Sequence, residues 1–327
     1  MSSSVPAGSV TPASPDTGSL APRHGRMHLL MLVATFCWAS NIVAGKEALR
    51  GFGALALAQL RVTGAALVLS ILLLIWKRRR PLPLQGRQWL QLGWVALFGI
   101  TLNQLSFIGG LSRSSVAHSA LIVALGPVMV LALSCLLRME ALTVLKFVGM
   151  MISFAGVGIL TIGKGEQANG ATLTGDLILL VASVVFAYYT VLMKDITRQY
   201  DALTLSTLIF ALGALMMAPV AAPSILKIRW SALPPQAWWG LAFMVFFGSV
   251  AAYLIYAVAL TELTAARAAA FAYLQPGIAT ALGIWLLGES LTRRVVFGGA
   301  LILLGVYLTE REREDERKNH LVAREWA

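Results

Sequence analysis

The chain has 327 residues, of which 58% are hydrophobic and only 13% are charged. A soluble domain carries about 25% charged residues, so this composition excludes a soluble globular domain, a disordered chain and a disulfide scaffold. The mean hydropathy of +0.76 indicates an integral membrane protein instead. The net charge of +11 does not indicate nucleic-acid binding, because the basic residues stand between long apolar runs, where they set orientation in the membrane.

Ten apolar segments follow an N-terminal stretch, residues 1–27, that is rich in Ser, Pro, Gly and Ala and is expected to be a disordered cytoplasmic tail. Most of the segments approach the ~20 residues with which an α-helix crosses a hydrocarbon core. Because lipid leaves no backbone group unpaired and only short polar turns separate the segments, the sequence predicts an all-α membrane protein rather than a barrel. The predicted transmembrane helices are 28–45, 54–76, 89–110, 114–137, 143–162, 174–193, 203–221, 238–260, 265–287 and 295–309.

The Lys and Arg residues predict the orientation of these helices. With the N-terminus in the cytoplasm, 17 of them fall on inner loops and tails and 8 on outer loops, and the densest cluster is the KRRR run at 77–80. Positive residues accumulate on the cytoplasmic side, so both termini are expected there. The mixed-charge tail 310–327 is expected to continue as a solvated helix.

An internal repeat divides the chain into two halves. A shift of 149 residues aligns 98–157 with 247–306 without a gap, with 17 identities in 60 positions. The identities include Glu, Pro and Gly, which chance pairing of apolar residues does not explain. Each predicted unit, 28–162 and 174–309, holds five helices, so the second unit enters the membrane from the opposite side. Two inverted five-helix repeats are a recurring plan of secondary transporters.

The repeated segments 124–162 and 273–309 also resemble a known family. Each has a mid-helix proline, then Glu-x-Leu-Thr, then a Gly-rich helix ending in Gly-Val, and this pattern is similar to the EamA domain of the drug/metabolite transporter superfamily. The first predicted helix matches the family's opening Trp-Gly-Ser-Asn stretch and its lysine at Trp38, Ser40, Asn41 and Lys46, although Ala39 replaces the usual glycine.

The resemblance covers roughly 28–309 and has one departure. Arg138-Met139-Glu140 stands where Gly-Glu is typical, while the second copy keeps Gly288-Glu289. The resemblance implies transport of small organic metabolites across a bacterial inner (cytoplasmic) membrane, and many bacterial members resemble amino-acid exporters. The substrate does not follow from membership.

Ten polar or aromatic side chains within the predicted helices are candidates for lining a central substrate cavity. Buried amides and Tyr hydroxyls need partners or water, and an apolar cavity with a few polar groups suits an amphipathic solute. The alternative is that each packs between helices or forms an interhelical hydrogen bond. The candidates are Trp38, Asn41, Asn103, Gln104, Tyr188, Tyr189, Tyr253, Tyr256, Tyr273 and Gln275. The cavity is expected between the helices 28–45, 89–110, 114–137, 174–193, 238–260 and 265–287.

Two prolines are candidate hinges. Pro127 and Pro276 each remove one backbone hydrogen bond and are expected to bend the predicted helices 114–137 and 265–287. Such breaks border the substrate site of many transporters, but a static kink is the alternative.

Four ionisable residues have a possible charge, proton or structural role. Arg61 lies within the predicted helix 54–76, where it either pairs with a substrate carboxylate or anchors the helix. His118 either moves a proton or packs as a hydrogen-bonded side chain. Glu140 and Glu289 are expected to begin the helices 143–162 and 295–309 as structural caps.

The sequence lacks the common catalytic motifs, which favours a transporter over an enzyme. No acidic residue lies in the middle of a predicted helix, and the sequence contains neither a hydrolase elbow nor a P-loop. The favoured hypothesis is therefore gradient-driven export of small metabolites, with amino acids, including aromatic ones, as the favoured class, by alternating access around the cavity. Uptake or antiport of another metabolite or drug is the alternative, and a membrane enzyme is a distant one.

The expected partners follow from this hypothesis. They are a small-molecule substrate and the lipid bilayer, without nucleic acid, cofactor or metal. Cys37 and Cys135 both lie in apolar runs, where a metal site is not expected. Ten helices can enclose a cavity alone, so a monomer suffices and an oligomer is not required.

Overall fold

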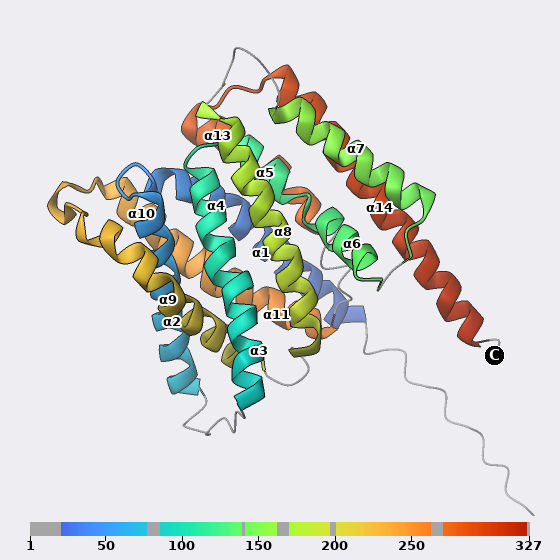
Figure 1. Ribbon diagram of the computed structural model, residues 1–327, viewed down its shortest axis with the longest axis horizontal. Coiled ribbons are helices and arrows are strands. Elements are labelled where there is room, and N and C mark those ends of the chain that lie inside the picture. Colours follow the sequence, from blue (N-terminus) through green and yellow to red (C-terminus); the bar gives the residue numbers. More distant parts are fainter. Residues whose placement is uncertain are drawn as a thin grey trace, which may run out of the picture.

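A computed structural model describes residues 21–76, 86–138, 141–161, 170–196, 201–262 and 271–325. Within these ranges all regular structure is helical, as the sequence predicts (Figure 1). The α-helices are α1 (Ala21–Ala48), α2 (Ala54–Trp76), α3 (Gly86–Ala96), α4 (Asn103–Leu111), α5 (Val116–Val123), α6 (Gly126–Leu136), α7 (Val144–Thr161), α8 (Leu173–Ile196), α9 (Ala202–Leu226), α10 (Pro235–Phe243), α11 (Ala252–Glu262), α13 (Gln275–Leu287) and α14 (Arg293–Glu325). The π-helical segments are η1 (Leu97–Leu102) and η4 (Met244–Ala251), and the 3₁₀ segments are η3 (Trp230–Ala232) and η5 (Phe271–Leu274).

Seven helical stretches among the described residues are long and apolar enough to cross a membrane. They match the predicted helices 28–45, 54–76, 89–110, 114–137, 174–193, 203–221 and 238–260. Two shorter apolar helices, Val144–Leu160 and Gln275–Leu287, fall within the predicted 143–162 and 265–287. The predicted 295–309 is the first part of α14, which continues into the charged tail as expected. Ten crossings remain a prediction. At the other end of the chain, α1 begins at Ala21, within the stretch assigned to the tail.

Three of the long stretches are not single α-helices. The predicted helix 114–137 is interrupted between α5 and α6, and π-helical turns interrupt 89–110 and 238–260. These irregularities recur at the offset of the sequence repeat. Shifting η1 by 149 residues places it within η4, and the same shift carries Leu125, which precedes α6, onto Leu274, which precedes α13.

The candidate hinge prolines lie at these interruptions rather than in the middle of a helix. Pro127 and Pro276 both occupy the first turn of their helices, α6 and α13. The first turn tolerates proline because its backbone N–H groups lack an intrahelical partner. The prediction of a kink inside a continuous helix is therefore corrected: each proline begins a new helix after a break.

Glu289 also differs from its expected role. Its carboxylate does not cap α14, but accepts hydrogen bonds from Val116 N (2.8 Å) and Ala117 N (3.2 Å) at the start of α5. The threonine of each Glu-x-Leu-Thr motif caps instead: the hydroxyl oxygens of Thr143 and Thr292 accept from the backbone of the first turns of α7 and α14, each at 3.3 Å. Glu140 lies outside the described residues.

Helices α7 and α14 pack against each other through glycines at one edge of the bundle (Figure 1). A Cβ on Gly149 would meet the carbonyl oxygen of Gly305 at 2.8 Å, and one on Gly156 would meet that of Gly298 at 2.7 Å. The two helices are thus antiparallel, and each of these two glycines on α7 contacts the repeat equivalent of the other: Gly298 is equivalent to Gly149, and Gly305 to Gly156. Small residues allow this close backbone approach in membrane helices.

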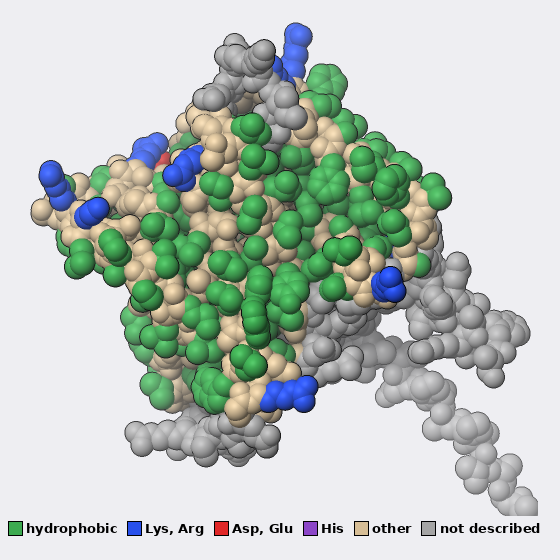
Figure 2. All heavy atoms as spheres, in the orientation of Figure 1, with side chains coloured by type: hydrophobic (Ala, Val, Ile, Leu, Met, Phe, Trp, Pro, Cys, Tyr) green, Lys and Arg blue, Asp and Glu red, His purple; other side chains and the backbone are tan. Residues whose placement is uncertain are grey.

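The helices of the bundle surround two main buried clusters. The largest is built mainly by α2 and α9 with α3, and the second by α5, α6, α7, α8 and α14. Large apolar side chains also cover the outside of the bundle, including Trp76 (80% exposed) and Leu226 (85% exposed). Figure 2 shows this apolar surface on one face of the molecule, with Lys and Arg at its margins. Such a surface is suited to contact with lipid.

Candidate functional site

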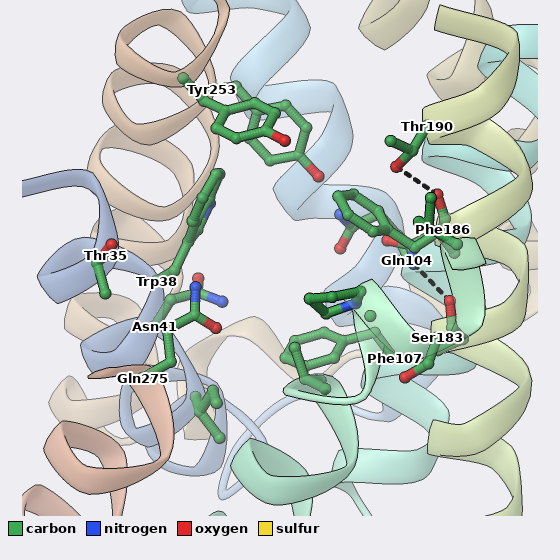
Figure 3. A pocket seen from close by; sticks show the side chains of 18 of the residues that line it. Thr35, Trp38, Asn41, Gln104, Phe107, Ser183, Phe186, Thr190, Tyr253 and Gln275 are labelled. Carbon is green, nitrogen blue, oxygen red and sulfur yellow. Dashed lines mark hydrogen bonds between the residues drawn. The ribbon is translucent and has the colours of Figure 1, made fainter. Parts of the chain in front are cut away.

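A cavity of about 230 Å³ lies at the centre of the bundle. Its walls come from α1, α2, α4, α5, α6, α8, α11 and α13 (Figure 3). The six predicted helices all contribute, and α2 adds Arg61, which the sequence-based cavity did not include. The lining residues are Met31, Thr35, Trp38, Asn41, Ile42, Arg61, Asn103, Gln104, Phe107, Val123, Gly126, Pro127, Val130, Ala182, Ser183, Phe186, Thr190, Tyr253, Tyr256 and Gln275.

Seven of the ten candidate cavity residues lie together on these walls: Trp38, Asn41, Asn103, Gln104, Tyr253, Tyr256 and Gln275. The other three pack elsewhere. Tyr188 contacts Phe98 with ring centroids 4.6 Å apart, and Tyr189 is buried against Gly99, where a Cβ would reach its ring. Tyr273 belongs to η5 and packs on the second buried cluster. For these three residues the packing alternative describes the observed contacts.

One wall of the cavity is aromatic. The ring of Trp38 on α1 makes edge contacts with Tyr253 and Tyr256 on α11, with centroids 6.0 and 5.3 Å apart. Phe210 of α9 supports Tyr253 from behind at 5.2 Å. Edge-to-face contacts of this kind hold rings in place. They fix an apolar surface on this side of the cavity, facing Phe186 and Phe107 in Figure 3.

Polar groups of the cavity divide into satisfied and unsatisfied ones. Asn103 donates to the carbonyl oxygen of Ala182 at 3.1 Å, and the Ser183 hydroxyl donates to that of Ile122 at 3.1 Å. In contrast, Asn41 Oδ1, Gln104 Oε1 and Thr35 Oγ1 are buried without a hydrogen-bond partner among the described residues. Buried polar atoms usually have a partner, so these oxygens mark where a polar ligand group would be accepted.

Arg61 is the charged residue of the cavity wall and is only 2% exposed. Its Nε donates to Ser249 Oγ at 2.9 Å, and its Nη2 lies 3.5 Å from the carbonyl oxygen of Gly248. Nη1 has no hydrogen-bond partner, and no carboxylate pairs with this guanidinium, within the described part of the chain. The Arg61 Cζ lies 6.0 Å from the centroid of the Phe107 ring, at the outer limit for a cation–π interaction.

His118 lies outside the cavity lining, in a hydrogen-bonded pair with Asp176 that the sequence analysis did not identify. Its Nδ1 is 2.8 Å from Asp176 Oδ2, and Ser114 Oγ donates to the other carboxylate oxygen. Asp176 is 2% exposed and lies in the first turn of α8. The pair joins α5 to α8. Spacing could not reveal it, because the two residues come from different halves of the chain.

The repeat offset would have revealed several cavity residues that the sequence analysis missed. Four pairs of lining residues are 149 positions apart: Asn41 with Thr190, Gln104 with Tyr253, Phe107 with Tyr256, and Gly126 with Gln275. Thr190, Phe107 and Gly126 were not candidates, although each is the repeat equivalent of one. Equivalent positions of the two halves therefore meet at this cavity.

Comparison with known proteins identifies the family. The sequence profile of the EamA-like transporter family matches the chain twice, at residues 25–162 and 173–311. The chain belongs to the EamA-like transporter family. An uncharacterized transporter of Archaeoglobus fulgidus is 30% identical over 288 residues, which cover 88% of this chain and 98% of that protein. An uncharacterized inner membrane transporter of Escherichia coli strain K12 is 26% identical, with 88% and 93% coverage.

This EamA-family chain is accordingly a multi-pass membrane transporter, and the predicted resemblance is confirmed. A relative in Streptantibioticus cattleyicolor, 23% identical over 89% of this chain and 94% of its own length, is named "Probable terminal-alkyne amino-acid exporter". A solved structure covers 87% of the chain with a TM-score of 0.58 at 17% identity, and 96% of that structure is matched. That likeness shows a shared fold.

Proposed function

We propose that this protein exports small organic metabolites, with amino acids as the favoured class, by alternating access around the central cavity. The observation that carries the proposal is the set of equivalent residues from both halves that line the cavity. Ten transmembrane helices in two inverted five-helix repeats would place such residues about a pseudo-two-fold axis. The two halves can then exchange conformations and expose the same site to either side.

The chemistry of the walls supports the substrate class. The aromatic surface of Trp38, Tyr253 and Tyr256 is suited to an apolar or aromatic side chain, and the unsatisfied oxygens and Arg61 are suited to polar ends of a solute. The distant amino-acid exporter among the relatives gives weak additional support. Uptake or antiport of another metabolite is the second candidate, since direction follows the gradients rather than the fold.

The breaks at α5–α6 and η5–α13 suit hinges between the two states. Both occur at the same repeat position, and Pro127 lies on the cavity wall. Pro276, its equivalent, is buried beside the cavity residue Gln275. The excess of Lys and Arg on one set of loops supports cytoplasmic termini in an inner membrane.

Flux from proteoliposomes tests the proposal. Vesicles with purified protein are loaded with labelled phenylalanine, tryptophan, threonine, methionine or a sugar control, and efflux is followed with and without a pH gradient. We expect saturable efflux of amino acids that persists without the gradient, because the lining residues that the structure describes include no acidic side chain. No flux above that of empty vesicles for every solute would overturn the amino-acid assignment.

Two matched variants connect the flux to the cavity. Trp38→Ala removes the centre of the aromatic wall, and we expect a rise in KM of roughly tenfold or more, on the scale of losing a buried aromatic contact. Trp239→Ala removes a tryptophan of the same size that is 77% exposed and outside the cavity, and flux should stay close to that of the wild type.

A further inference from the structure

We propose that Arg61 binds the carboxylate of the transported solute, while the amide oxygens of Asn41 and Gln104 accept hydrogen bonds from its ammonium group. The site would thus recognise a zwitterionic α-amino acid by its carboxylate and ammonium groups, and the aromatic wall would contact its side chain. This inference rests on the proposed transport function and names the residues that would select the substrate class.

No negative side chain among the described residues compensates the charge of Arg61. The side chain is almost fully buried within a membrane helix, yet its only described partners are a hydroxyl and a backbone carbonyl. An ionisable group inside the membrane is costly and is normally paired. Since the described residues that line the cavity include no Asp or Glu, a negative group on the solute is the natural counter-ion. The unpaired Nη1 gives the guanidinium a free donor for it.

Ser249 and Gly248 fix the guanidinium against η4. Nε donates to Ser249 Oγ at 2.9 Å, and Nη2 lies near the Gly248 carbonyl oxygen, so both contacts are on one edge of the guanidinium. Nη1, at the other end of the group, has no partner among the described residues. Both Ser249 and Gly248 lie in the π-helical segment η4, which packs against α2. An arginine held in advance loses less side-chain entropy when it binds a carboxylate.

The unsatisfied acceptors lie on other walls of the same cavity. Asn41 Oδ1 on α1 and Gln104 Oε1 on α4 are buried and without partner among the described residues, as is Thr35 Oγ1 one helical turn and a half from Asn41. Acceptors are what an ammonium group requires, because it has three donors and no acceptor. A free donor on a cation together with several free acceptors matches a zwitterion better than an anion or a cation alone.

Matched solutes test the inference on the wild-type protein. Binding is measured by the shift in thermal unfolding of the purified full-length protein as phenylalanine, its primary amide or 3-phenylpropanoate is titrated. The amide keeps size and ammonium but loses the negative charge, and 3-phenylpropanoate keeps the carboxylate but loses the ammonium. We expect phenylalanine to bind 10–100-fold more tightly than its amide, which corresponds to a charge-assisted hydrogen bond, and several-fold more tightly than 3-phenylpropanoate.

Variants assign each preference to a residue. Arg61→Gln should bring the ratio of the binding affinities for phenylalanine and its amide close to one. Arg61→Lys keeps the positive charge but loses the planar guanidinium, so it should give an intermediate ratio. Gln104→Leu should reduce the preference for phenylalanine over 3-phenylpropanoate. Arg113→Gln removes an exposed arginine outside the cavity lining, whose guanidinium donates hydrogen bonds to Gly109 and Ser112, and both ratios should be those of the wild type.

The outcomes separate this inference from the proposed function. Equal binding of acid and amide by the wild type would overturn the inference even if Arg61→Gln fails to fold, and so would a preference for the acid that survives in Arg61→Gln. Absence of flux for every solute, with the acid preference intact, would contradict transport of amino acids and leave the binding site standing.

Discussion

Glu289 is the residue whose structural role is most easily measured. It precedes α14 in sequence, yet it caps the start of α5 by accepting two backbone hydrogen bonds. Glu289→Ala should lower the free energy of unfolding by about 0.5–2 kcal/mol, the cost of a lost N-cap, because Val116 N and Ala117 N lose their acceptor. Thermal unfolding of the detergent-purified protein measures the change.

Glu47→Ala is the matched control for this prediction. Glu47 forms an i,i+3 pair with the largely exposed Arg50 at 3.1 Å, and pairs of this kind contribute about 0–1 kcal/mol. A stability loss in Glu289→Ala no larger than that in Glu47→Ala would show that the cap on α5 contributes nothing beyond surface charge.

Sequence reasoning found most of the polar cavity wall but misjudged individual roles. Asn41, Gln104 and Gln275 could be predicted because amides are conspicuous in an apolar helix. Tyr188 and Tyr189 could not be separated from Tyr253 by sequence alone, since which face of a helix meets the cavity depends on packing between helices. The caps by Glu289 and the Asp176–His118 pair join segments far apart in the chain, which spacing does not predict.

At the scale of elements, the pairing of α7 with α14 makes a direct prediction. Gly156→Ala should destabilise the protein by about 1–3 kcal/mol, as overpacked cores do, because the new Cβ would lie 2.7 Å from the carbonyl oxygen of Gly298. Gly158 is on the same helix, and a Cβ there meets nothing within 4 Å, so Gly158→Ala should be neutral or stabilising.

Thermal unfolding of the two variants side by side measures this difference. Equal stability of Gly156→Ala and Gly158→Ala would mean that the close contact between α7 and α14 is not maintained in the protein. Both substitutions remove the same backbone freedom of a helical glycine, so the comparison isolates the contact.

Hydropathy predicted where helices lie but not where they break. The runs 89–110 and 114–137 are apolar on average over their whole length, so mean hydropathy gives no sign of η1 or of the break before α6. Pro127 is a local signal from which the sequence predicts a hinge or a static kink within a continuous helix, whereas the structure places it in the first turn of a new helix, which also tolerates proline. The repeat offset carries more information, because breaks and π-helical turns recur at equivalent positions in both halves.

At the scale of the whole molecule, the repeat and the cavity belong to one arrangement. The offset of 149 residues that aligns the sequence also relates the glycines between α7 and α14, the threonine caps and four pairs of cavity residues. All-helical membrane architecture and the transporter family could be predicted from the sequence. The shape of the cavity could not, because it depends on how eight helices tilt and break around it.

A cysteine on the cavity wall tests most directly whether solute passes through this cavity. Thr190 lies on the wall and is the repeat equivalent of Asn41; Thr190→Cys is made in a chain whose Cys37 and Cys135 are replaced by alanine. Ser231→Cys, on exposed η3, is the control, and labelling of both by a bulky thiol reagent is quantified by mass spectrometry. We predict that labelled Thr190→Cys loses flux in proteoliposomes, that saturating solute slows its labelling, and that labelled Ser231→Cys transports normally. Fully labelled Thr190→Cys protein that transports as fast as unlabelled protein would contradict the account.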